Sequence, residues 1–139
     1  MKRIALFFAM LMVVSLSGCS KDAQVEAFLT EFDTVTKDVV AKIDANPSSA
    51  GVDEAQKALD ARKTALQTKW DAIKDAVGLQ VSKDTKRKLE SSVQNNVKAL
   101  VEVGNRNAVK LAADKDAVTK FQHLIQDFSA TFAPPTARK

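Results

Sequence analysis

The stretch that decides the fold is residues 22–51, DAQVEAFLTEFDTVTKDVVAKIDANPSSAG. In its first part, apolar side chains recur at steps of three and four: Val25, Phe28, Leu29, Phe32, Val35, Val39, Val40 and Ile43. This spacing places them along one side of an α-helix. The cluster 46–51, which is rich in Pro, Ser and Gly, then interrupts the pattern. The stretch therefore predicts a helix from about Asp22 to Ala45 that ends in a turn.

The same periodicity continues beyond this turn. It predicts a second helix over residues 52–77, followed by Gly78 in the left-handed conformation that often ends helices. Ser82 is the expected N-cap of a third helix. The apolar positions of the remaining chain are Leu89, Val93, Val97, Leu100, Val101, Ala108, Leu111, Ala112, Val118, Phe121, Leu124, Ile125, Phe128 and Phe132. Pro134 and Pro135 then exclude further helix.

The boundary between the third and fourth helices has three possible positions. The apolar stripe passes through Gly104 almost in phase, and no proline stops it. A turn at residues 104–107 gives an up-down-up-down four-helix bundle. Without a turn, the chain forms a three-helix bundle with a long last helix. A turn at residues 114–116 is the third possibility. Four helices of similar length are preferred, because a long overhang would expose a large apolar patch.

Composition supports one all-α globular domain. The chain has 139 residues, of which 45% are hydrophobic and 27% charged, with only four Gly and three Pro. Good helix formers dominate such a sequence. The 21 basic residues, which include Lys2 and Arg3 at the start, stand against 17 acidic ones. This near balance gives no basis for a nucleic-acid partner.

The first residues have the three parts of an export signal. Lys2 and Arg3 are followed by an unbroken apolar run, 4–14, and then by the small residues of 15–18. A helix of that run is about 16 Å long, roughly half the thickness of the hydrocarbon layer. The run is therefore too short to span a bilayer, and we expect a cleaved signal peptide at residues 1–18.

The tetrapeptide Leu16-Ser17-Gly18-Cys19 resembles the lipobox of bacterial lipoproteins. The resemblance implies cleavage before Cys19, a diacylglycerol thioether on its sulfur and often a further acyl chain, such as palmitate, on its amino group. Several acyl chains give the stable anchoring that a single chain does not. The resemblance covers only the export region. The expected division is a signal peptide at 1–18, a helical bundle domain at 19–133 and a short tail at 134–139.

Ser20 bears on the membrane that the lipid would enter. In enterobacterial lipoproteins, an Asp after the lipidated cysteine marks retention in the inner membrane. Ser20 therefore implies the outer membrane, facing the periplasm, in a Gram-negative cell. In another envelope the expected location is the outer face of the cytoplasmic membrane.

The C-terminal Arg138-Lys139 resembles the end of the major outer-membrane lipoprotein of enterobacteria, whose terminal lysine is joined to peptidoglycan. That family has one unbroken heptad helix. Pro47 and Gly51 interrupt the pattern here, which argues against the same link at Lys139 and leaves the question open.

The sequence carries no recognisable catalytic, metal or cofactor motif. The only cysteine is assigned to lipid, all three methionines lie in residues 1–12, and His123 is the single histidine. Di-iron bundles need two Glu-x-x-His pairs, and covalent haem needs Cys-x-x-Cys-His. We therefore predict a protein that is not an enzyme and has no cofactor, bound metal or small-molecule substrate.

The function predicted from these features is that of a lipid-anchored, cell-envelope helical lipoprotein acting as a protein-interaction or structural module. Its expected partners are the membrane, through Cys19, and an envelope protein that the sequence does not identify. The basic residues Lys83, Lys86, Arg87 and Lys88 are the candidate partner face. The alternative function is binding of a small apolar or lipid ligand inside the bundle.

Overall fold

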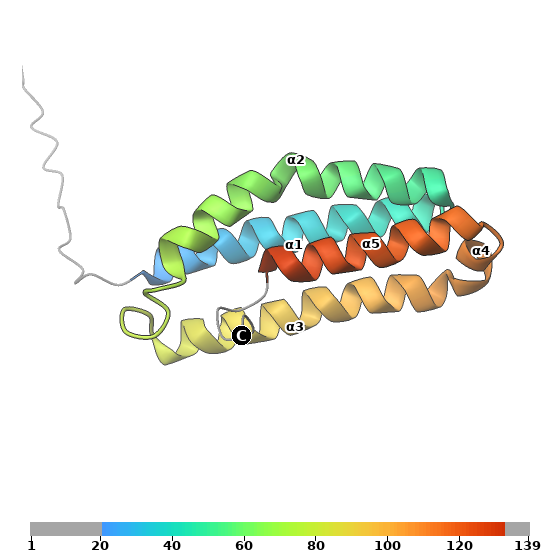
Figure 1. Ribbon diagram of the computed structural model, residues 1–139. Coiled ribbons are helices and arrows are strands. Elements are labelled where there is room, and N and C mark those ends of the chain that lie inside the picture. Colours follow the sequence, from blue (N-terminus) through green and yellow to red (C-terminus); the bar gives the residue numbers. More distant parts are fainter. Residues whose placement is uncertain (1–20, 133–139) are drawn as a thin grey trace, which may run out of the picture.

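The computed structural model describes residues 21–132 (Figure 1). The expected signal peptide, the lipidation site Cys19 and the tail at 134–139 lie outside the described residues. The helices are α1 (Asp22–Ala45), α2 (Ser49–Ile73), α3 (Lys83–Arg106), α4 (Ala108–Ala112) and α5 (Lys115–Phe132). Residues 21–132 contain no strand, which confirms the all-helical prediction, although with five helices where four were expected. Within this range, no helix is both long and apolar enough to cross a membrane.

The four long helices lie side by side and alternate in direction (Figure 1). α1 packs against both α2 and α3, whereas α5 packs mainly against α2 and contacts α3 much less. The start of α1 and the α2–α3 loop lie at one end of the molecule (Figure 1). The α1–α2 turn and α4 lie at the other end (Figure 1).

One hydrophobic core joins these helices. Its centre is a row of aromatic rings: Phe28 and Phe32 of α1 have centroids 5.6 Å apart, and Phe32 lies 5.3 Å from Phe128 of α5. Trp70 of α2 completes the row, 5.5 Å from Phe28. The three phenylalanines are almost fully buried, and burying a side chain of this size contributes about 1.5–3 kcal/mol. The apolar stripe predicted for α1 therefore faces the core, with only Val40 left half-buried.

The turn between α1 and α2 is shorter than the sequence suggests. α2 begins at Ser49, because the side chain of Ser48 caps it by accepting a hydrogen bond from Gly51 N at 3.5 Å. Gly51 lies within the first turn of α2, where a Cβ atom would overlap the carbonyl of Asn46. The predicted start at Val52 is wrong, because this glycine permits close approach of the backbone and does not break the helix.

The loop at residues 74–82 follows α2, which ends at Ile73 and not at Val77. No glycine within residues 21–132 has a positive φ, so the left-handed conformation predicted for Gly78 is wrong. The expected N-cap of α3 is confirmed. Ser82 Oγ accepts a hydrogen bond from Thr85 N at 3.2 Å.

The third boundary begins at Asn107, the last residue of the predicted turn at 104–107, but it does not end there. α3 continues through Gly104 to Arg106, and Asn107 separates it from α4. The side-chain nitrogen Nδ2 of Asn107 donates to Val103 O at 3.0 Å and to Asp44 Oδ1 at 2.7 Å. Asp114 immediately precedes α5, and its Oδ1 accepts a hydrogen bond from Ala117 N at 3.2 Å. The chain therefore reverses between Asn107 and Asp114, a stretch that overlaps both of the turns considered above, with α4 between them.

Candidate interaction surfaces

An open groove between α3 and α5 is the most apolar hollow described on the surface. Its volume is about 340 Å³, and it is lined by Val101, Gly104, Asn105, Ala108, Leu111, Val118, Phe121, Gln122 and Ile125. None of these side chains is charged. Val101 is 46% exposed and Val118 is 38% exposed, although both belong to apolar stripes. Exposed apolar side chains that gather in one place mark a surface suited to contact with another molecule.

The groove exists because of where small and large residues meet. Gly104 lies opposite the ring of Phe121, and a Cβ atom on Gly104 would overlap that ring. Phe121 and Ile125 are half-buried, and Leu111, which also lines the groove, is buried. Val97, which is 38% exposed, continues the apolar strip along α3. The floor of the groove therefore consists of apolar side chains that are partly or fully buried.

A second hollow, of about 430 Å³, lies between α1 and α3, and all but one of the residues that line it are polar or charged. A carboxylate oxygen of Asp33 accepts hydrogen bonds from Ser92 Oγ at 2.7 Å and Asn96 Nδ2 at 2.6 Å. Asn96 is buried, at 7% exposure. These contacts satisfy one another across the two helices, so their evident role is to fix how α1 and α3 are aligned.

The four basic residues predicted as a partner face do not act as one unit. Lys88 Nζ donates to Glu26 Oε1 at 2.7 Å, which raises the pKa of this lysine. Lys86 Nζ donates to Gly78 O at 2.9 Å. Lys83 and Arg87 are exposed at the start of α3, where Arg87 Nη1 lies 3.7 Å from Asp84 Oδ1 in an exposed ion pair. The last two are therefore the basic side chains of this set most available to a partner.

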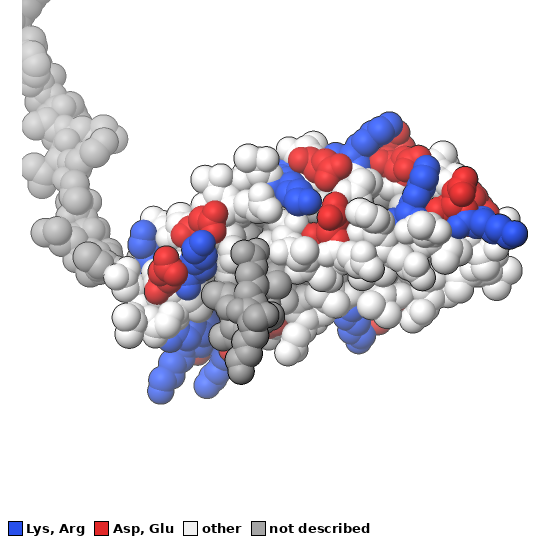
Figure 2. Space-filling view, in the orientation of Figure 1, with Lys and Arg blue, Asp and Glu red and all other residues white. Residues whose placement is uncertain are grey.

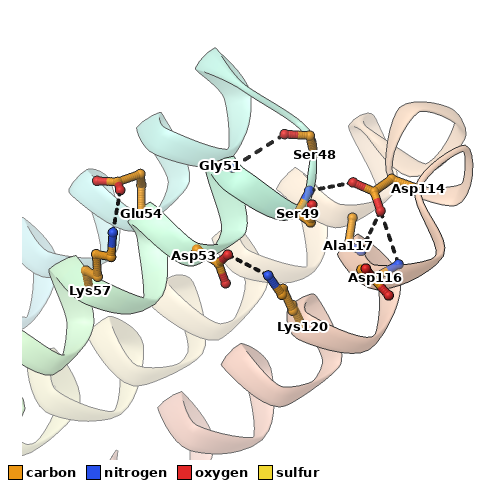
Figure 3. Close-up of polar contacts among 10 residues, drawn as sticks. All are labelled: Ser48, Ser49, Gly51, Asp53, Glu54, Lys57, Asp114, Asp116, Ala117 and Lys120. Carbon is orange, nitrogen blue, oxygen red and sulfur yellow. Dashed lines mark hydrogen bonds and ion pairs between the residues drawn. The ribbon is translucent and has the colours of Figure 1, made fainter.

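His123 lies in a third hollow, of about 280 Å³, between α2 and α5. The polar groups beside it are already paired. Lys120 Nζ lies 2.5 Å from Asp53 Oδ2 (Figure 3), and Gln56 donates to Asp127 Oδ2 at 3.1 Å. Within residues 21–132, no group of three His, Cys, Asp or Glu side chains is placed to hold a metal ion. The contacts around this hollow hold α5 against α2.

Sequence reasoning missed the groove because it assigned Val97, Val101 and Val118 to the core. A signal was nevertheless present. The apolar stripe of α3 is wider than one packing seam requires, and the small residues Gly104 and Ala108 lie beside it.

Comparison with known proteins gives no match: no protein-family model, no curated protein and no solved structure is significantly similar to this chain.

Proposed function

We propose that this protein is a lipid-anchored lipoprotein of the cell envelope and works as a non-enzymatic interaction module. Its body is an up-down-up-down four-helix bundle, with α4 completing the connection between the third and fourth long helices. The observation that carries the proposal is the uncharged groove between α3 and α5, which leaves valine side chains exposed. The lipobox at 16–19 supports the anchor.

The partner that suits this groove is an amphipathic helix of another envelope protein. A helix places its apolar side chains at intervals of three and four residues, which fits a channel between two packed helices. The groove offers no charge to pair with a phosphate or a carboxylate. Attachment to the membrane would raise the effective concentration of the module near such a partner.

The alternative of a ligand inside the bundle receives no comparable support. The stacked rings of Phe28, Phe32 and Phe128 occupy the middle of the molecule, where such a ligand would have to lie.

Site-specific photo-crosslinking in cells tests the groove. A photoreactive amino acid replaces Val118 in the groove or, as a matched control, Val109, a valine that is 86% exposed and does not line it. We expect irradiation to give a discrete adduct with another envelope protein from position 118 only. Identical adducts from both positions, or none from position 118, would contradict the proposal. An adduct of twice the mass of the chain would show that the groove binds a second copy of this protein and not a different envelope protein.

Metabolic labelling tests the anchor. Growth with labelled palmitate should mark the native protein, and Cys19→Ser should abolish the label because the acceptor sulfur is lost. Equal labelling of the two proteins would remove the anchor from the proposal and leave the groove unaffected.

A further inference from the structure

The loop at residues 74–82 presents one large apolar side chain to solvent. Leu79 is 92% exposed, whereas Val81 in the same loop is buried and Val77 is packed partly against the core. A single exposed leucine is ordinary on a protein surface. What distinguishes Leu79 is its position relative to the expected lipid and to the charges around it.

Hydrogen bonds fix this loop to the start of the described chain. Lys21 N donates to Gln80 O at 2.9 Å, and Ser82 N donates to Asp22 Oδ1 at 2.9 Å. The side chain of Lys86 binds the loop from α3, through Gly78 O at 2.9 Å. These contacts connect the loop to residues 21 and 22 and to α3.

Cys19 is only two residues from this point in the sequence. Two residues of fully extended chain span about 7 Å. A lipid on Cys19 would therefore hold the end of the molecule that carries Leu79 close to the bilayer surface, with no long linker between them.

Charge is distributed unevenly between the two ends. Residues 74–88 hold five basic and two acidic side chains, whereas residues 44–54 and 106–116, at the opposite end, hold three basic and five acidic ones. Figure 2 shows Lys and Arg side chains projecting from the lower left of the molecule, where α3 starts. The end nearest Cys19 is thus the one suited to a negatively charged surface.

We propose that this end docks on an anionic lipid bilayer, with Leu79 inserted at the interface and Lys83 and Arg87 beside the lipid phosphates. The inference rests on the lipid anchor proposed above and adds an orientation to it. An apolar side chain enters the boundary between headgroups and acyl chains, and nearby basic side chains add electrostatic attraction. Each Lys or Arg close to such a surface strengthens binding about fivefold.

The orientation can be measured with one fluorophore. Because lipid occupies Cys19, an introduced cysteine is the only free thiol available to an environment-sensitive dye. The reporter is Gly78→Cys, which leaves Leu79 intact and whose Cβ meets no atom within 4 Å. The control reporter is Val109→Cys at the far end. Both are made in the full-length lipidated protein and reconstituted into phosphatidylethanolamine–phosphatidylglycerol vesicles that contain a quenching lipid.

We expect several-fold stronger quenching at position 78 than at position 109. Leu79→Gln should reduce the quenching at 78. Lys83→Gln with Arg87→Gln should shift the docking equilibrium about fivefold per charge removed, whereas Lys110→Gln at the far end should not shift it.

The two proposals fail in distinguishable ways. A palmitate-labelled protein with equal quenching at both positions would overturn the orientation alone. A protein that takes up no palmitate would overturn the anchor and the orientation with it.

Discussion

Gly104 shows how one missing side chain shapes a surface. It lies within α3, where glycine is unfavourable for helix stability. Because Gly104 has no side chain, the ring of Phe121 can lie directly against the backbone of α3, where it forms part of the groove floor.

We predict that Gly104→Ala destabilises the protein by about 1–3 kcal/mol despite the better helix propensity of alanine, because the added methyl group must displace the Phe121 ring. Denaturant unfolding followed by circular dichroism measures this change. Gly78→Ala is the control, since nothing lies within 4 Å of its added Cβ. A stabilised Gly104→Ala variant would contradict the packing described for Phe121.

Asp114 gives one source of pH dependence. Hydrogen bonding from Ser49 N to Oδ2 at 2.8 Å, together with donation to Oδ1 by Ala117 N and Asp116 N, lowers the pKa of Asp114 (Figure 3). A carboxyl group with a lowered pKa in the folded state stabilises the fold above its unfolded pKa of about 3.9. That contribution is lost as the pH falls through the lowered value.

We therefore expect Asp114→Asn to lower the melting temperature at neutral pH and to show a smaller further loss below about pH 4 than the native protein does. Thermal unfolding monitored across this range checks the expectation. Lys115→Gln changes a neighbouring charge without touching the cap, so it should keep the native pH profile. An Asp114→Asn profile parallel to the native one would mean that the cap does not contribute.

Between elements, the contact of Asp33 with Ser92 and Asn96 sets the alignment of α1 and α3. Hydrogen bonds to a charged group contribute more than those between neutral groups, at about 1.5–3 kcal/mol each. Because Ser92 and Asn96 both donate to the Asp33 carboxylate, the contributions of the three residues are not independent.

We predict that Asn96→Ala costs about 1.5–3 kcal/mol of unfolding free energy. The double variant with Asp33→Ala should lose less than the sum of the two single losses. Equilibrium denaturation of all three variants completes the cycle. Asn95→Ala, at an exposed neighbouring position, should change little. Strict additivity would show that the contact does not couple the helices.

Local chemistry explains which element limits could be predicted from the sequence. The limits of α1 and the Ser82 cap agree with the structure because they depend on periodicity and on one nearby side chain. The starts of α2 and α5 depend on other segments. Gly51 lies within α2 in close contact with the backbone of Asn46, and Asp114 accepts a hydrogen bond from Ser49 N, 65 residues earlier in the sequence. Such contacts leave no periodic signal.

For the whole molecule, the core ties the first helix to the last. Phe128 of α5 stacks on Phe32 of α1, and both are almost completely buried.

We predict that Phe128→Ala lowers the unfolding free energy by about 3–5 kcal/mol. Chemical denaturation should detect the loss with circular dichroism and with Trp70 fluorescence at the same midpoint, because α2 shares this core. Val109→Ala should be nearly neutral. Two separate midpoints would contradict a single core.

The candidate groove shows the limit of sequence reasoning at this scale. Periodicity indicates that a side of a helix is apolar, but not which neighbour covers it. α5 packs mainly against α2, so Val101 and Val118 remain uncovered although their spacing matches that of buried residues. Only the arrangement of all the helices shows which apolar side chains remain exposed.

The length of α1 has a consequence for the choice of partner. Its 24 residues measure about 36 Å. If the end that carries Leu79 docks on the membrane, the groove, which lies towards the opposite end, would be tens of ångströms from the lipid headgroups. A partner embedded wholly in the bilayer could not touch it there. The partner helix proposed for the groove would therefore have to lie at a similar distance from the membrane surface, a distance that the length of α1 determines.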